Sequence, residues 1–326
     1  MSTSLKFTYD NNILRYSSRD YDRAKDGTEY YISPVKTLDD MRSDLKLSAS
    51  YKIKVFKKAE TKLSATGDFA HYAINSINTF GWASFSANQD VSRAWHLYLN
   101  YFYEPYYFLR DYNDDHTGER HHADFAMSKS MAKVFYRPTK LIEYAVFGEF
   151  KRYAYNEYFT EFDGDRLGVG AEAVLRKGHW RVAMSYAFGT YDNLGFDDLD
   201  RIPPEFQDTE DNENGDGSYE EDTYEVSCAY SFRINKSRAR ARVNVQVDDR
   251  YYNTALPLEL DAIHHGRNDL IITTTASFYY SLTRDLGVNV GSTYYNRDSE
   301  ATSTIVANLK NYSRVIGWLE VSYDIW

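Results

Sequence analysis

The sequence predicts an all-β protein whose strands form a single antiparallel barrel. Apolar and polar residues alternate with period two along most of the 326 residues, which is the pattern of a strand with one apolar face. The connections between these stretches are alternately short and long. Aromatic residues are abundant, with 31 Tyr, 18 Phe and 5 Trp, whereas Pro occurs only 6 times. This composition favours strands.

The alternation can be followed along the chain. In 45–55, the apolar residues Leu45, Leu47 and Tyr51 alternate with Lys and Ser. The same pattern returns in 63–69, 167–175, 180–188, 224–234, 239–247, 270–280, 286–292 and 315–325. The stretches 80–88 and 123–135 change phase partway, so the sequence leaves their apolar faces open. The first stretch, 5–9, is interrupted by Asp10-Asn11-Asn12.

The connections define two ends of the barrel. Short links occur near 57–60, 89–92, 137–140, 176–178, 235–237 and 283–285, and longer ones near 19–41, 74–79, 111–120, 158–163, 191–221, 254–267 and 297–304. They imply about fourteen strands, and outer-membrane barrels have an even strand number, short periplasmic turns and long extracellular loops. Both chain ends then fall on the short-turn side.

The apolar faces predict contact with a membrane. The sequence has no window of about 18 apolar residues, which excludes a transmembrane helix. Only every second strand residue faces lipid in a barrel, so a mean hydropathy of −0.62 is compatible with one. Aromatic residues stand where strands should meet the membrane interfaces: Trp95, Tyr101, Tyr103, Trp180, Tyr224, Tyr294, Tyr312 and Tyr323. The predicted location is a bacterial outer membrane, in contact with its lipid and lipopolysaccharide.

The start of the chain lacks a signal peptide. Met1-Ser2-Thr3-Ser4 has neither a basic start nor an apolar run, so we interpret the sequence as a mature chain. The final Trp326 resembles the terminal aromatic residue that barrel assembly machinery reads in outer-membrane proteins. A net charge of −10 argues against nucleic-acid binding.

The polar faces predict the lining of the lumen. Arg238, Arg240 and Arg242 form a basic column, and other Arg and Glu residues share these faces. Such charges either contact a solute or pair across neighbouring strands and stiffen the wall. Aromatic residues also fall on the polar faces and are candidates for stacking on sugar rings or for packing on an internal loop: Tyr98, Phe102, Tyr106, Phe147, Tyr153, Tyr155, Tyr279, Tyr295 and Trp318.

Other motifs give weaker signals. The acidic stretch 197–222 echoes an EF-hand loop but has Thr223 where the bidentate Glu should stand, so loose divalent binding and a solvated loop both stay open. His121-His122 and His264-His265 do not show the convergence that a zinc site needs. A hydrolase on the barrel wall would need His grouped with Ser or Asp, and we expect neither enzyme activity nor a cofactor.

The whole chain resembles the monomeric fourteen-stranded outer-membrane channels, and among them the cyclodextrin porins. The resemblance rests on chain length, strand count, tyrosine richness and the stretch 4–15, Ser-Leu-Lys-Phe-Thr-Tyr-Asp-Asn-Asn-Ile-Leu-Arg. It implies a monomer in which residues 1–15, with Phe7, Tyr9, Asn11 and Asn12, form a gate inside the lumen, and residues 16–326 form the barrel.

The expected function is passive diffusion of oligosaccharides, cyclic glucans (cyclodextrins) in particular. The expected solute contacts are the pore-lining Tyr98, Phe102, Tyr106, Tyr153, Tyr155, Arg238, Arg240, Arg242, Tyr279 and Trp318. The alternatives are a general or acidic-sugar porin, which the arginine column favours, and a barrel hydrolase.

Overall fold

A computed structural model describes residues 1–26, 34–56, 59–114, 119–196 and 215–325, without the side chains at 55, 56, 113 and 305. Within these residues, fourteen antiparallel strands close into one barrel, each paired with its neighbours in sequence. The strands are β1 (Ser2–Asp10), β2 (Asp40–Phe56), β3 (Ala59–Tyr72), β4 (Phe80–Asp90), β5 (Trp95–Asn113), β6 (Arg120–Tyr136), β7 (Ile142–Tyr155), β8 (Gly164–Lys177), β9 (Trp180–Asn193), β10 (Tyr219–Ile234), β11 (Ser237–Tyr252), β12 (Asn268–Ser281), β13 (Leu286–Glu300) and β14 (Tyr312–Asp324). The predicted fold class is confirmed.

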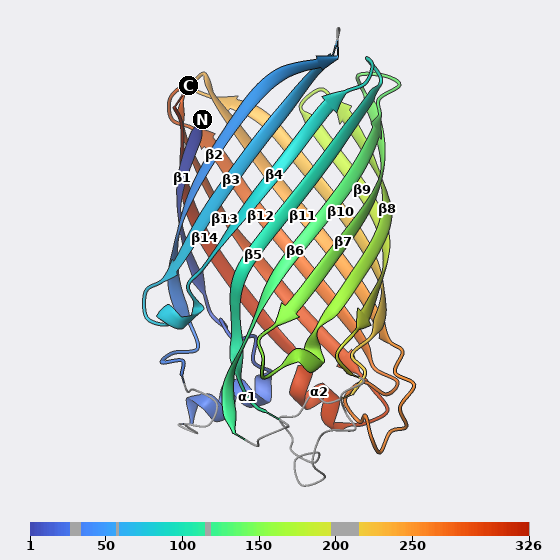
Figure 1. Ribbon diagram of the computed structural model, residues 1–326. Coiled ribbons are helices and arrows are strands. Elements are labelled where there is room, and N and C mark those ends of the chain that lie inside the picture. The colour runs from blue at the N-terminus through green and yellow to red at the C-terminus, as the bar shows by residue number, and fades with distance from the viewer. Residues whose placement is uncertain (27–33, 57–58, 115–118, 197–214, 326) are drawn as a thin grey trace.

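The two ends of the barrel differ as the sequence predicts. Figure 1 shows both chain termini and the short turns at one end, and the longer loops with helices α1 (Ser18–Lys25) and α2 (Ile305–Lys310) at the other. Single 3-10 turns, η2 (Ser76–Asn78) and η3 (Thr160–Phe162), also lie in the longer loops. No helix of the described residues is long and apolar enough to cross a membrane.

The turn between β10 and β11 illustrates the local chemistry at the short-turn end. Asn235 and Lys236 both have positive φ, at 49° and 73°, as a two-residue turn that matches strand twist requires. Asn tolerates this conformation well. The turn fixes the register in which Arg233 of β10 lies directly opposite Arg238 of β11.

The outer face of the barrel is apolar. Leu63, Phe85 and Val146 expose 41%, 58% and 60% of their surface, which a water-soluble protein would bury. Hydrogen bonds along every strand edge, including the β1–β14 seam, satisfy the backbone, as a chain in hydrocarbon requires. Of the eight aromatic residues predicted at the interfaces, seven are exposed on this face. The exception is Tyr312, which is buried inside.

The structure assigns inner and outer faces to 80–88 and 123–135, the two stretches whose apolar faces the sequence left open. In β4, Trp82, Ser84 and Ser86 face inward and Phe85 outward. In β6 the usual contrast is inverted, because the larger side chains of Phe125 and Met131 lie on the inner rows while small residues face outward. That inversion explains why alternation alone did not assign the face.

The expectation of a lumenal gate at residues 1–15 is wrong for Ser2–Asp10, and so is a barrel that starts at residue 16. These residues form β1, which pairs with β14 and β2 along its whole length. Leu5, Phe7 and Tyr9 face outward, 41–44% exposed. A strand with an apolar outer row and two paired edges belongs to the wall, because removing it would expose unpaired backbone to lipid.

Only the residues after β1 leave the wall. The Asn11 side-chain oxygen still accepts a hydrogen bond from the Val315 backbone at 2.7 Å. Asn12 is buried in the segment that leads to α1. Ile13, Leu14 and Tyr16 then join a buried cluster with Phe108 of β5 and with Ala24, Val35 and Tyr72. This cluster fills part of the long-loop mouth.

Candidate functional site

The candidate site is the inner face of the barrel. The register places Tyr98 and Phe102 (β5), Tyr153 and Tyr155 (β7), Arg238, Arg240 and Arg242 (β11), Tyr279 (β12) and Trp318 (β14) on the rows that alternate with the exposed apolar ones. Tyr106 lies in a register shift of β5 and packs against the buried mouth cluster. Whether these side chains contact a solute stays a prediction.

Most of the inward rings pack on other protein groups. Phe125 contacts the rings of Tyr153 and Tyr155, with centroids 5.6 and 5.2 Å apart. Phe102 packs on Trp82 at 5.3 Å. These rings are therefore partly packed on other rings of the wall, whereas the sequence suggested sugar rings or an internal loop as their partners.

Two inward rings lie over glycines of β13. A Cβ at Gly287 would lie 2.5 Å from the Tyr279 hydroxyl oxygen, and one at Gly291 would collide with the Trp318 ring. The small residues thus let the rings lie flat along the wall. The Lys6 ammonium lies 4.9 Å from the centroid of the Trp318 ring, a favourable cation–π distance.

Two inward arginines of the strands in the long-loop half, Arg166 and Arg250, are paired with carboxylates. Arg166 forms ion pairs with Glu149 and with Glu221, the latter at 2.8 Å. Arg250 pairs with the same Glu221 at 2.7 Å. These side chains are mostly buried, so here the charges stiffen the wall.

The arginine column, which we define as Arg233, Arg238, Arg240 and Arg242, lies in the short-turn half and differs. None of these four forms an ion pair with a described carboxylate. They border or lie beside a cavity of about 1750 Å³ at the short-turn mouth. Its lining holds Lys62, Arg233, Lys236, Arg238, Arg240 and Arg284 against the carboxylates of Asp285 and Asp324. The mouth is therefore basic although the chain as a whole is acidic.

The register brings like charges together in this column. Arg233 and Arg238 are direct cross-strand partners, and like charges in that position destabilise a sheet. Arg242 of β11 and Arg181 of β9 flank Ala229 in one row. Glu172 and Glu225 line the small pocket beside Arg181 and Arg242, so the excess of positive charge is greatest from Arg240 to the turn.

The histidines that the sequence singled out lie in the long-loop end. His264 Nδ1 lies 2.9 Å from Asp261 Oδ1, and both side chains are buried. His265 Nδ1 lies 3.1 Å from the Leu256 carbonyl. Neither ring bonds to a serine hydroxyl among the residues that the structure describes. The Asp–His pair thus ties a loop at the long-loop end.

A metal site was also considered from the sequence. His122 bonds Asp111 at 2.5 Å, and His121 stacks on Tyr158 at 3.8 Å. Among the described residues, no group of three or more His, Cys, Asp or Glu side chains could hold a metal ion. Most of the acidic stretch 197–222, and Trp326, lie outside the described residues.

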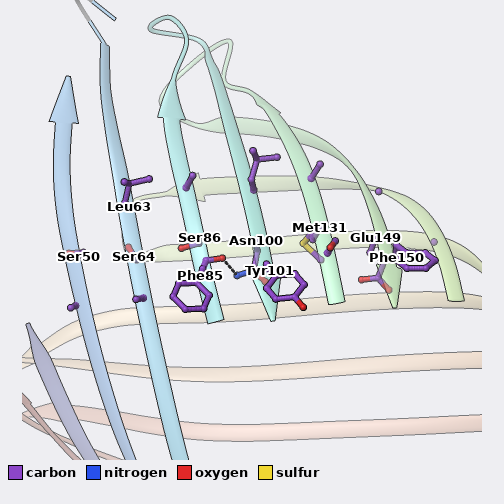
Figure 2. A pocket seen from close by; sticks show the side chains of 18 of the residues that line it. Ser50, Leu63, Ser64, Phe85, Ser86, Asn100, Tyr101, Met131, Glu149 and Phe150 are labelled. Carbon is purple, nitrogen blue, oxygen red and sulfur yellow. Dashed lines mark hydrogen bonds between the residues drawn. The ribbon is translucent and has the colours of Figure 1, made fainter. Parts of the chain in front are cut away.

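A second hollow lies on the outer face and is distinct from the lumen. Leu63, Phe85, Tyr101 and Phe150 surround a shallow groove over β3 to β7 (Figure 2), and Ala65, Ala132 and Gly148 also line it. The Asn100 side chain donates to the Phe85 carbonyl at 3.2 Å across this region. Because its walls are apolar and face hydrocarbon, this groove suits lipid and not a polar solute.

Sequence reasoning missed Arg15 and Tyr107. Arg15 Nη2 donates to the Tyr107 hydroxyl at 3.3 Å inside the long-loop mouth. The signal was the run Ile13-Leu14 directly after a strand end, because apolar residues in a long loop have to pack somewhere. The sequence did not show where these residues pack, and the family resemblance placed residues 1–15 in a lumenal gate.

The fold and the two faces together define a transmembrane β-barrel of a bacterial outer membrane. Such barrels carry an apolar outer band, a polar interior, short periplasmic turns and longer extracellular loops, and all four features are present. The long-loop mouth is thus the extracellular one.

Known proteins are similar in fold only. No family model and no curated protein matches the chain. Solved structures with similar folds include a bacterial polysaccharide outer membrane secretin (10% identity, TM-score 0.47, 99% of this chain and 98% of that one). They also include the outer membrane channel DcaP of Acinetobacter baumannii (12%, 0.47, 99% and 96%) and an anion-selective porin from Comamonas acidovorans (7%, 0.44, 99% and 98%).

Proposed function

We propose that the protein is a passive diffusion channel for oligosaccharides and that acidic oligosaccharides pass in preference to neutral ones, cyclic glucans included. The observation that supports this most strongly is the arginine column at the periplasmic mouth, unpaired among the described residues. A barrel wall with cross-strand arginines that form no ion pair with a described carboxylate is under electrostatic strain. An anionic solute relieves it.

The chemistry of the column suits a carboxylated sugar. A guanidinium offers two parallel N–H donors to one carboxylate. The Arg240 guanidinium carbon lies 6.0 Å from the centroid of the Tyr279 ring, so an apolar ring face and a cation stand side by side. A sugar acid presents both a C–H face, which suits the Tyr279 ring, and a carboxylate, which suits the arginine. A neutral glucan presents only the C–H face.

Planar-bilayer recording tests the proposal. Wild-type protein should conduct and give an anion-selective reversal potential in a tenfold KCl gradient. Oligogalacturonate should block the current for longer than a maltooligosaccharide or a cyclodextrin of similar size. Liposome swelling should rank the same solutes in the same order.

A control variant at the same end separates the effect of the column from that of an exposed charge in a turn. The variant R238Q/R240Q/R242Q should shift selectivity towards cations and shorten the acidic blockades. A single R93Q change, in the exposed turn between β4 and β5, removes charge at the same end and should leave both unchanged. A barrel that does not conduct, or equal blockades by acidic and neutral sugars in the wild type, would contradict the proposal.

A further inference from the structure

The segment after β1 makes a tight turn at residues 12–16. The Asn12 side chain closes it, accepting from the Tyr16 backbone N–H and donating to the Tyr16 carbonyl, each at 2.9 Å. Arg15, inside the turn, has φ +54°, a conformation uncommon for residues other than Gly. Strained residues of this kind persist where the surroundings hold them, often at functional sites.

The turn is fixed to strand β5 and to the loop that precedes β2. The Leu14 carbonyl accepts a hydrogen bond from Arg110 Nη2 of β5 at 3.1 Å, and the Arg110 guanidinium lies 5.0 Å from the Tyr16 ring centroid. The Ile13 N–H donates to the Leu38 carbonyl at 2.9 Å. Since Ile13, Leu14 and Tyr16 are also buried, the turn is a rigid support and not a loose loop.

Arg15 is the exposed residue of this buried turn. Its guanidinium contacts the Tyr107 hydroxyl, and Tyr295, Tyr312 and Asp10 lie near it. These groups belong to β5, β13, β14 and β1. A side chain that is exposed and also close to residues of four wall strands lies in the lumen.

The charge of Arg15 is not neutralised by a described carboxylate within ion-pair distance. The nearby Asp10 carboxylate is held by Arg314 Nε at 2.8 and 3.0 Å. The phenol rings of Tyr295 and Tyr312 stack at 5.2 Å beside it. At the extracellular mouth the Arg15 cation therefore stands among aromatic rings.

We infer that Arg15 is a specificity-determining residue at the extracellular mouth, where it binds the carboxylate of an acidic oligosaccharide while the surrounding phenols contact its sugar rings. This inference rests on the proposed function and adds a second anion subsite, at the opposite end from the arginine column. An acidic oligosaccharide would pass from Arg15 to the column along one wall of the lumen.

Blockade kinetics with R15Q and R15G test the inference. Both variants should shorten blockades by oligogalacturonate added at the long-loop side by about tenfold, the change expected on losing a charge-assisted hydrogen bond. Blockades by a neutral maltooligosaccharide should not change. The K25Q variant removes a charge from an exposed position of α1 and should behave as wild type.

The two variants guard against a folding artefact. Gly adopts positive φ readily, so R15G keeps or relaxes the turn while it removes the guanidinium, and heat-modifiable gel mobility confirms that each barrel is folded. Wild-type blockade times in both variants would overturn the inference even if the channel conducts and prefers acidic sugars. A wild-type barrel without conductance would instead overturn the proposed function.

Discussion

Replacing Asp269 by Asn should destabilise the barrel strongly. The Asp269 side chain is fully buried and accepts hydrogen bonds from Arg267 at 2.9 and 3.0 Å and from Arg297 at 2.6 Å. Without the carboxylate, two guanidinium groups stay close together with no counter-charge between them. Removing one partner of a buried ion pair costs about 3–5 kcal/mol.

A matched change on the outside sets the scale. Asp165 accepts a two-pronged pair of hydrogen bonds from Arg152 at 2.8 and 2.6 Å, but the Arg152 side chain is 57% exposed. An exposed pair of this kind is worth about 1 kcal/mol or less. D269N and D165N remove the same charge and both replace one carboxylate oxygen by an amide nitrogen, so their difference measures the combined effect of burial and of the second arginine at Asp269.

Urea unfolding in detergent micelles, followed by tryptophan fluorescence and gel mobility, measures both variants. We expect D269N to lose about 2–4 kcal/mol more than D165N, the difference between the two ranges. Equal losses, or a loss below about 1 kcal/mol for D269N, would show that the Arg267–Asp269–Arg297 group does not hold the loop end as argued.

Three further predictions concern single sites. G291V should push the Trp318 ring off the wall at a cost of about 1–3 kcal/mol, seen as altered tryptophan fluorescence; an unchanged spectrum would argue against the packing. N12A should lose both bonds to the Tyr16 backbone, so hydrogen exchange at the residue 16 amide should rise while barrel stability holds. Burial alone would raise the pKa of Asp261, but its hydrogen bond to His264 and the His264 charge outweigh burial and hold the pKa below 3.8. The ionised carboxylate therefore stabilises the loop above the lowered pKa, and this contribution is lost as pH falls through it. Amide hydrogen exchange in 254–267 should rise in that pH range in the wild type, whereas D261N, which lacks the carboxylate, should show no such rise.

Much of the fold could be predicted because one face of each strand meets lipid and the other meets water, which gives a record of alternating apolar and polar residues in the sequence. That record fails where the two sides are not chemically distinct. In β6, Ser130 and Ala132 face outward into the groove of Figure 2 while Met131 faces inward. Small outward side chains there follow from the shape of the outer surface, and polarity does not distinguish the two faces.

The first strand shows a different limit. Leu5, Phe7 and Tyr9 carry the correct alternation, but Asp10-Asn11-Asn12 follows at once. The family resemblance drew the whole stretch into the lumen, whereas the wall ends at Asp10, whose carboxylate binds Arg314. An ion pair between residues 304 positions apart leaves no local trace in sequence.

The sequence predicted which residues face the lumen but not which of them lie next to one another. Alternation placed Arg240 and Tyr279 on the inner face correctly, and adjacency of the two followed only from the β11–β12 register. Which arginines are neutralised depends on partners several strands away, such as Arg166 with Glu221. Arg15 was out of reach because its place depends on how a loop packs, for which no periodicity exists.

The seam between β1 and β14 has a consequence for how the molecule is assembled. Thirteen of the pairings join strands that are neighbours in sequence, while the last joins the two ends of the chain. Until synthesis and export deliver both ends, the sheet has two open edges that would pair with any other strand. Pairing of β1 with β14 therefore removes both open edges at once.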